Sequence, residues 1–462
     1  MSHEADDDRL HEEGEVRSGD GLAPGDPRAA RATRSAGRPA WSLLGEYVAV
    51  RRATEDLCAP LTDEDMAAQS MPDASPAKWH LAHTTWFFET FLLVPHLAGY
   101  EPFHPRFGYL FNSYYNALGT PFPRPRRGIL TRPGHAEVRA YRRHVDDHLA
   151  ALLEAASGER LAELERLLEI GLNHEQQHQE LLLTDVKHLF SLNPLLPSYR
   201  PDSARPTLVS SPAGGGDDPD WTAHPGGLLE VGHAGGGFAF DNEGPRHRVF
   251  LEPFRLADRL VTCGEFVEFM GDDGYRRPDP WLSEGWDAAR AGSWEAPLYW
   301  ERRDGEWHVF TLAGLLPVDL EAPVCHLSFF EADAFARWAG ARLPTEEEWE
   351  AVAATQPVRG HLAADGILHP VPAPPAAGGG PRQLFGDVWE WTASPYRPYP
   401  GFQAPAGALG EYNAKFMSGQ MVLRGGSCVT PAGHIRATYR NFFGPAARWQ
   451  FSGLRLARDG GE

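Results

Sequence analysis

The segment Asn173-His174-Glu175-Gln176-Gln177-His178 lies inside a long amphipathic run from Arg160 to Leu192, which stops at Asn193-Pro194. Apolar residues recur in this run at helical spacing, so it predicts one long helix. His174 and His178 are four residues apart and therefore share one face of that helix. Two imidazoles in this arrangement can bind a single metal ion, which makes the segment the first candidate for a functional site.

Three further segments show helical periodicity: Ser42 to Leu57, Trp79 to Leu93 and Val138 to Leu153. Four long helices predict an up-and-down bundle over residues 41–200, a frame that builds metal sites from side chains on facing helices. A third candidate ligand, His83, lies in the second segment. His80 competes for the same role, and its alternative is a helix cap or a surface histidine.

A His-x-x-x-His pair is a weak signal by itself, because such pairs are often solvated on a polar helix face. Here Gln176, Gln177 and Gln179 form a polar island in a leucine-rich helix, and polar groups that face a bundle interior need partners such as a metal ion. The second histidine does not complete a His-Glu-x-x-His motif, which disfavours a zinc protease. Three histidines without a fourth protein ligand suit an open site for zinc or ferrous iron, and spacing does not distinguish these metals.

The segment Gly99 to Pro133, rich in proline, tyrosine and arginine, predicts an irregular excursion between two helices, and such loops often carry function. Tyr114 and Tyr115 are adjacent in it. Such a pair usually has one packed and one exposed ring; the functional alternative is a phenol near the metal that donates a proton or an electron. Arg124-Pro125-Arg126-Arg127 serves either as a local salt-bridge partner or as a clamp for a substrate carboxylate, which the guanidinium fork fits.

The rest of the chain differs from the predicted bundle in composition and in hydrophobic pattern. Residues 1–40 contain no Phe, Trp or Tyr and predict a disordered tail, and residues 201–221 have the composition of a linker. From 222 to 460, short β-like runs alternate with Gly and Pro turns. Two convincing helices are predicted there, Thr262 to Met270 and Ser328 to Trp338, and Thr345 can cap another. The chain is therefore expected to be an α+β protein.

Composition excludes several classes of function. With 462 residues the chain is expected to hold two or three domains, and its net charge of −20 disfavours nucleic acid as a partner. The scattered cysteines (Cys58, Cys263, Cys325 and Cys428) predict neither a zinc knuckle nor a disulfide framework, and a reducing cytoplasm fits them. No apolar run approaches the roughly 18 residues that span a bilayer, and no signal peptide opens the chain, so no membrane partner is expected.

Several motifs together are typical of one known family. They are Leu-Ala-His at 81–83, His-Glu-Gln-Gln-His at 174–178, Phe-Gly-Asp-Val-Trp-Glu-Trp-Thr at 385–392, Val-Leu-Arg-Gly-Gly-Ser at 422–427, Tyr-Arg-Asn-Phe-Phe at 439–443 and Gly-Leu-Arg-Leu-Ala at 453–457. Over about residues 41–460 the chain resembles the ergothioneine-pathway sulfoxide synthases. These are non-haem iron enzymes with an N-terminal DinB-like four-helix bundle and a C-terminal domain similar to the formylglycine-generating enzyme, which is related to C-type lectins.

The resemblance implies an O2-dependent oxidation that joins a thiol sulfur to an imidazole carbon of hercynine (Nα-trimethylhistidine) and gives a sulfoxide. The Fe(2+) ligands of the family fall on His83, His174 and His178. Gln177 and Asn441 match positions that surround the trimethylammonium group through water. Phe442 can offer its ring face to the same cation.

The chain departs from the family pattern in the predicted thiol pocket. Members that use γ-glutamylcysteine carry Trp-Asp after the asparagine, and an arginine four residues after that aspartate; this chain has Phe442, Phe443 and Ala447 there. An arginine pair at matching spacing is present as Arg124 and Arg127. We therefore predict L-cysteine as a better sulfur donor than γ-glutamylcysteine.

In the cysteine-using branch the redox-active phenol comes from the excursion, which favours Tyr114 or Tyr115 over Tyr396 and Tyr399 of the second domain. Alternative functions are a carbon–selenium bond former similar to selenoneine synthase, and a formylglycine-generating oxidase. The oxidase needs two closely spaced cysteines where this chain has only Cys428. A zinc hydrolase and a lectin-like binding module are further alternatives.

Overall fold

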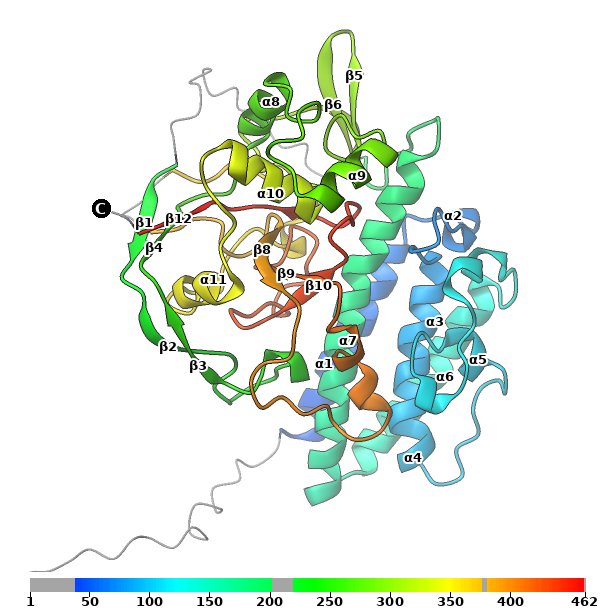
Figure 1. The fold of residues 1–462 in the computed structure, drawn as a ribbon. Helices are drawn as coiled ribbons and strands as arrows, with labels where there is room; N and C mark the ends of the chain where they lie inside the picture. Colours follow the sequence, from blue (N-terminus) through cyan, green and yellow to red (C-terminus); the bar gives the residue numbers. More distant parts are fainter. Residues whose placement is uncertain (1–37, 202–218, 376–379, 461–462) are drawn as a thin grey trace, which may run out of the picture.

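The computed structural model describes residues 38–201, 219–375 and 380–460, so most of the predicted tail (1–40) and linker (201–221) lies outside the described residues. The N-terminal part is a bundle of four long helices, as predicted (Figure 1). These helices are α1 (Ala40–Cys58), α3 (Ala77–Phe88), α6 (His135–Ala155) and α7 (Gly158–Ser191). The shorter elements of this part are α2 (Asp63–Ala67), a π-helical turn η2 (Glu89–Leu93), α4 (Val94–His96), α5 (Phe107–Phe111), and the 3-10 turns η3 (Asn116–Leu118) and η4 (Arg124–Ile129).

Helix α3 forms the centre of the bundle, because each of its residues from Ala77 to Phe88 is buried. It packs against α6 and α7. Gly171 allows the close approach of α7, since a Cβ atom at this position would lie 2.4 Å from the ring of Phe88. Because Gly171 has no side chain, α3 and α7, the two helices that carry the candidate histidines, can pack at short range.

A buried ionic cluster ties three helices of the bundle together. Glu175 of α7 accepts hydrogen bonds from Arg51 (2.9 Å) and Thr54 (2.6 Å) of α1 and from Arg142 (2.8 Å) of α6. Its carboxylate is fully buried. Glu175 therefore serves the packing of the bundle, although it stands between the two histidines of the motif.

The C-terminal part combines short helices with small sheets. Its helices are α8 (Cys263–Gly271), α9 (Ser283–Ala291), α10 (Phe329–Trp338) and α11 (Glu346–Ala353), and its 3-10 turns are η5 (Asp241–Glu243), η6 (Ala363–Asp365), η7 (Ala408–Glu411) and η8 (Ala414–Phe416). Its strands are β1 (Trp221–His224), β2 (Gly227–Val231), β3 (His247–Leu251), β4 (Phe254–Ala257), β5 (Trp300–Arg303), β6 (Glu306–Thr311), β7 (Gly314–Pro317), β8 (Trp389–Pro395), β9 (Met421–Arg424), β10 (Asn441–Phe443), β11 (Ser452–Gly453) and β12 (Ala457–Asp459). Within the described ranges they form sheets in the orders β1-β4-β12, β10-β9-β8-β11, β2-β3 and β5-β6-β7.

In the C-terminal part, the helices that the sequence predicted are those that begin with a capping residue. Thr262, Ser328 and Thr345 each cap the helix that follows through a reciprocal bond with a glutamate three residues later, as the sequence indicates. Helix α9 was not predicted. Leu282 precedes it and forms no side-chain cap, so the sequence carries no start signal for this helix.

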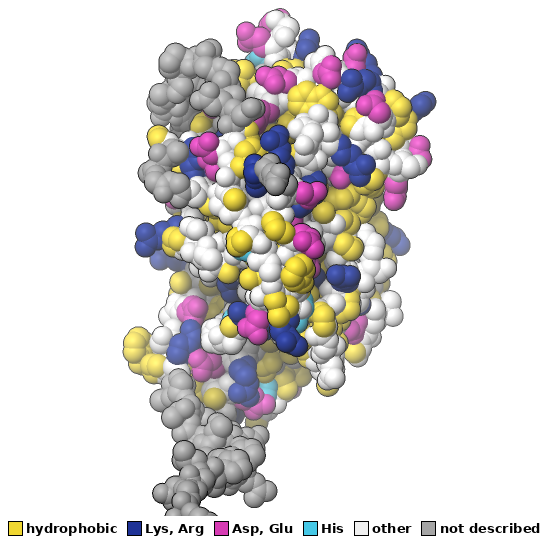
Figure 2. Space-filling view, turned by 60° about the vertical axis from the view of Figure 1, so that its left-hand side comes forward, with side chains coloured by type: hydrophobic (Ala, Val, Ile, Leu, Met, Phe, Trp, Pro, Cys, Tyr) yellow, Lys and Arg dark blue, Asp and Glu magenta, His cyan; other side chains and the backbone are white. Residues whose placement is uncertain are grey.

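Helix α7 runs between the two parts of the molecule (Figure 1). One side of it packs on α1 and α3, and another side contacts the C-terminal part through Asn173, Gln177, Glu180 and Lys187. None of the described helices combines the length and the apolar character that a membrane crossing needs. Figure 2 shows basic and acidic side chains mixed over the face that it presents.

Candidate metal centre

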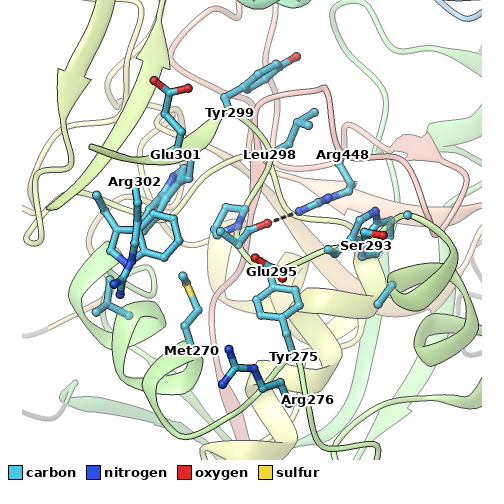
Figure 3. A pocket seen from close by; sticks show the side chains of 18 of the residues that line it. Met270, Tyr275, Arg276, Ser293, Glu295, Leu298, Tyr299, Glu301, Arg302 and Arg448 are labelled. Carbon is cyan, nitrogen blue, oxygen red and sulfur yellow. Dashed lines mark hydrogen bonds between the residues drawn. The ribbon is translucent and has the colours of Figure 1, made fainter. Parts of the chain in front are cut away.

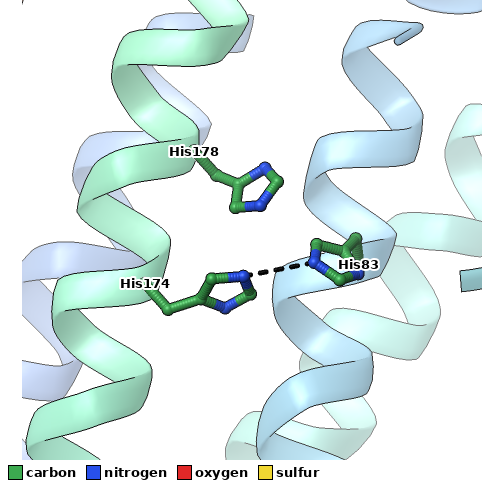
Figure 4. Close-up of side chains that lie close together, drawn as sticks. All are labelled: His83, His174 and His178. Atoms are coloured by element: carbon green, nitrogen blue, oxygen red, sulfur yellow. Dashed lines mark hydrogen bonds between the residues drawn. The ribbon is translucent and has the colours of Figure 1, made fainter. Parts of the chain in front are cut away.

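His83 of α3 and His174 and His178 of α7 lie together inside the bundle (Figure 4). One ligand nitrogen from each imidazole can be chosen so that all three lie within 4.8 Å of one another. The Nε2 atoms of His83 and His174 are 3.2 Å apart. The spacing of four residues on α7 places its two histidines on one face, and the close approach at Gly171 brings α3 within reach of both.

Burial keeps these imidazoles neutral, which is the form that binds metal ions. Loss of hydration lowers the pKa of His83 and of His178 well below the usual value, and the neighbouring histidines lower both further. The pKa of His174 falls to about 3, because burial outweighs the opposing effect of Glu175. Trp79 and Trp86 stack on His83 at ring distances of 4.6 Å and 5.5 Å, which fixes the plane of its ring.

The donor set fits a single bound metal ion. The Nδ1 of His83 lies 2.6 Å from the carbonyl oxygen of Phe111, so this nitrogen carries the proton and Nε2 keeps its lone pair. The Nδ1 of His174 is buried and has no hydrogen-bond partner among the described residues. A lone pair on His83 that faces the Nε2 of His174 needs a proton or a cation between the two nitrogens. Three neutral imidazoles meet this need with one metal ion.

His80 is neither a cap nor a surface residue, in contrast to the alternative expected from the sequence. It is buried at 2% exposure. Its Nδ1 lies 2.8 Å from the Nδ1 of His178, and its Nε2 lies 3.0 Å from Oδ2 of Asp185. His80 therefore contacts a candidate metal ligand from outside the group of three histidines.

The rings of Tyr114, Tyr115 and Tyr412 form a cluster that reaches the histidines through Tyr412 and Trp86. Tyr115 is fully buried, its ring stacks on Tyr114 at 4.8 Å, and its hydroxyl has no hydrogen-bond partner among the described residues. The ring of Trp86 lies between Tyr115 (5.6 Å) and His83 (5.5 Å). Burial raises the pKa of Tyr115 well above its usual value, so the phenol stays protonated.

The third of these tyrosines, Tyr412, was missed in the sequence. Its ring lies 5.6 Å from His174 and 6.5 Å from Tyr114, and its hydroxyl donates to the side-chain oxygen of Gln177. It lies just after η7, in an irregular segment that gives no periodic signal. Tyr396 and Tyr399, the less favoured alternatives to Tyr114 and Tyr115 in the sequence, instead contact Asn242 and Glu346 of the C-terminal part.

The predicted hercynine residues lie where the two parts of the chain meet, although no contact joins all of them. Gln177 donates to the hydroxyl of Tyr439 at 2.6 Å. Phe442 stacks on Tyr396 at 4.1 Å and lies 5.8 Å from Phe416, whose ring is 5.3 Å from Tyr114. Asn441 is half-buried, and its side-chain oxygen accepts from the backbone N–H of Phe442.

A cavity of about 490 Å³ lies beside this centre, between α7 and the loop that follows β10. Its lining includes Arg124, Phe443 and Ala447, together with His80 and Asp185. Arg127 is not part of this lining. It is buried, lies 3.3 Å above the ring of Trp79 and donates to the hydroxyl of Ser75. The structure thus separates the two arginines that the sequence suggested as a pair.

A larger cavity, of about 1000 Å³, lies in the C-terminal part (Figure 3). It is lined by α8, α9 and the loop before β5, with Tyr275, Arg302 and Arg448 among its side chains. None of the residues predicted for the site lines it. Size alone therefore does not identify the functional site of this chain.

Known proteins resemble both parts of the chain. The DinB superfamily model matches residues 46–182, and the model of the sulfatase-modifying factor enzyme 1-like domain matches residues 210–460. The hercynine oxygenase of Mycolicibacterium smegmatis is 34% identical over 90% of this chain and 98% of its own length. That of Mycolicibacterium thermoresistibile is 35% identical over 86% of this chain and 90% of its own. The ergothioneine biosynthesis protein 1 of Schizosaccharomyces pombe is 27% identical over 48% of this chain and 28% of its own length.

Proposed function

The chain belongs to the hercynine oxygenase family, and from this premise we propose that it is an iron(II)-dependent sulfoxide synthase of ergothioneine biosynthesis. It joins the imidazole carbon of hercynine to the sulfur of L-cysteine with O2 as the oxidant. The hercynine C–H and the thiol S–H bonds are lost, and a C–S bond forms. One oxygen atom ends on sulfur and the other leaves as water, so O2 takes up four electrons.

The single observation that carries this proposal is the group of three buried, neutral imidazoles contributed by α3 and α7. His83, His174 and His178 would hold the iron. Bound iron(II) would supply open coordination positions and would mediate electron transfer from the substrates to O2. Bringing the thiol, the imidazole and O2 to one centre gains proximity and orientation.

The cavity beside the centre supports cysteine as the sulfur donor. Arg124 provides a guanidinium group for one carboxylate, whereas Asp73, Asp185 and Glu284 give the cavity an acidic lining. Cysteine carries one carboxylate and one ammonium group, while γ-glutamylcysteine adds a second carboxylate that this lining repels. Phe443 and Ala447 offer neither a carboxylate nor a guanidinium group for a glutamyl moiety.

We assign the trimethylammonium group of hercynine to Gln177 of α7 and to Asn441 and Phe442 of β10. Phe442 offers a ring face for the cation, and Gln177 and Asn441 offer carbonyl oxygens directly or through water. We assign proton donation to Tyr115, with Tyr114 stacked on it, because its buried hydroxyl has no hydrogen-bond partner among the described residues and a reactant would supply one.

The formylglycine-generating alternative is disfavoured by the cysteines. Cys428 is buried and free, and burial raises the pKa of its thiol well above the usual value, so it is a poor nucleophile. The selenium alternative differs in the donor, so product mass separates it from sulfur chemistry.

The proposed function is tested by mass spectrometry of an aerobic reaction with Fe(II), hercynine and either cysteine or γ-glutamylcysteine. We expect a product with the mass of hercynine plus cysteine plus O2 minus one water, and a higher kcat/KM for cysteine. Formation of cystine alone would reject the reaction, and a clear preference for the dipeptide would reject the assigned donor.

A further inference from the structure

His80 forms a buried bridge between a candidate metal ligand and a carboxylate. It lies on α3, and both of its ring nitrogens are engaged, one with His178 at 2.8 Å and the other with Asp185 at 3.0 Å. Asp185 is seven residues after His178 on α7, so both lie on the same side of that helix. The backbone N–H of Ser75 also donates to Oδ2 of Asp185, at 2.8 Å.

The chemistry of the bridge fixes where the protons lie. A carboxylate oxygen only accepts hydrogen bonds, so the Nε2 of His80 must donate to Asp185. A neutral His80 then has its lone pair at Nδ1, and the Nδ1–H of His178 donates to it. His178 in this tautomer keeps the lone pair at Nε2, the nitrogen left free to bind a metal ion.

The same logic applies to His83, where the carbonyl oxygen of Phe111 holds the proton at Nδ1. Among the described residues no carbonyl oxygen takes this role for His178, and His80 takes it instead. We propose that His80 is a positioning residue that sets the tautomer and ring orientation of His178, and that Asp185 anchors it. This inference rests on the proposed function, because it presumes a metal ion at the three histidines.

The test measures metal affinity in the absence of both substrates. Fe(II) dissociation constants are determined anaerobically by chelator competition, and Co(II) absorption spectra report the coordination geometry. His80→Leu removes both hydrogen bonds, whereas His80→Gln keeps one acceptor and one donor. His148→Leu on α6 is the matched control, because this imidazole packs on Tyr100 and His144 and takes no part in the group of three histidines.

We expect His80→Leu to weaken Fe(II) binding about 10- to 100-fold, the usual effect of losing an outer partner of a metal ligand. His80→Gln should recover part of the affinity and of the Co(II) spectrum, and His148→Leu should match the wild type. Asp185→Leu, which removes the bridge from its other end, should act in the same direction as His80→Leu.

Wild-type affinity in the folded His80 and Asp185 variants would overturn the inference. A defect in His80→Leu that His80→Gln shares in full would overturn it as well, because loss of packing and not of the hydrogen bonds would then explain it. A wild-type chain that binds Fe(II) but makes no sulfoxide would reject the proposed function and leave the role of His80 standing.

Discussion

At the scale of single residues, Glu175 stands between two candidate metal ligands and yet points into the packing of the bundle. Burial alone would raise the pKa of this carboxyl group, but Arg142, Arg51 and the hydroxyl of Thr54 outweigh burial and lower the pKa to about 2. The charged form is therefore stabilised by the fold. Since the folded pKa lies below the ordinary value, this stabilisation is complete above about pH 4.5 and is lost as the pH falls toward 2.

Replacing Glu175 with glutamine should reduce the free energy of unfolding by about 3–5 kcal/mol, because Arg51 and Arg142 lose their buried counter-charge and keep only the more exposed Asp146 and Glu55. Urea denaturation measures this, with Glu163→Gln on the exposed side of α7 as the control. The difference between the two variants should shrink as the pH is lowered from 5 toward 2. A Glu175→Gln variant as stable as the control at neutral pH would refute this account of the cluster.

Tyr115 and Tyr412 present opposite hydrogen-bonding states beside the same histidines. The hydroxyl of Tyr412 is engaged with Gln177, whereas that of Tyr115 has no partner among the described residues. We predict that Tyr115→Phe lowers the rate of sulfoxide formation by about 100-fold or more, the range of a lost proton donor. Tyr412→Phe should cost less than about tenfold. The measurement is the amount of sulfoxide formed by each variant, determined by mass spectrometry. A larger loss in Tyr412→Phe than in Tyr115→Phe would assign proton donation to Tyr412.

At the scale of elements, two sides of α7 contact different parts of the molecule. His174, Glu175 and His178 face the bundle, whereas Asn173, Gln177, Glu180 and Lys187 face the C-terminal part at the spacing of one helix side. The polar island of this helix was expected to face the bundle interior. Gln179 does so, donating to Val50 and Thr54 of α1, but Gln177 binds the other domain.

Glu180 is the main polar contact between α7 and the C-terminal motifs. It accepts from the indole N–H of Trp389 (2.8 Å) and from the hydroxyls of Ser427 (2.6 Å) and Thr430 (2.8 Å). Glu180→Ala leaves three donors without their acceptor, which should cost about 2–4 kcal/mol and uncouple the two domains. Urea unfolding should then show two transitions, while Glu163→Ala shows the wild-type curve. An unchanged curve for Glu180→Ala would mean that apolar contacts alone join the domains.

The helices of the bundle were predictable because their periodicity and stop signals are local. The grouping of His83 with the pair on α7 was also suggested by the sequence, since α3 and α7 both bear histidines on faces that can meet. The roles of His80 and Tyr412 were not, because they depend on contacts between residues that are distant along the chain. His80 meets a carboxylate on another helix, and Tyr412 lies in a segment without regular structure.

At the scale of the whole molecule, the bundle provides the three candidate metal ligands, and the C-terminal domain contacts α7, which carries two of them. The cavity with Arg124 is shared by both, since Arg124 belongs to the excursion of the bundle, whereas Phe443 ends β10 and Ala447 lies in the loop after it. Neither part alone presents both the histidines and the predicted hercynine residues. This arrangement explains why motifs from the two halves occur together in one chain.

The most direct test of the central claim is an anaerobic titration of the full chain with Fe(II), comparing the wild type with the His83→Ala, His174→Ala and His178→Ala variants. We predict one tightly bound iron per wild-type chain and a large loss of affinity in each variant. The control is His148→Ala, which should bind as the wild type does. Iron binding at wild-type affinity by all three of these variants would contradict the account, because the metal would then lie elsewhere.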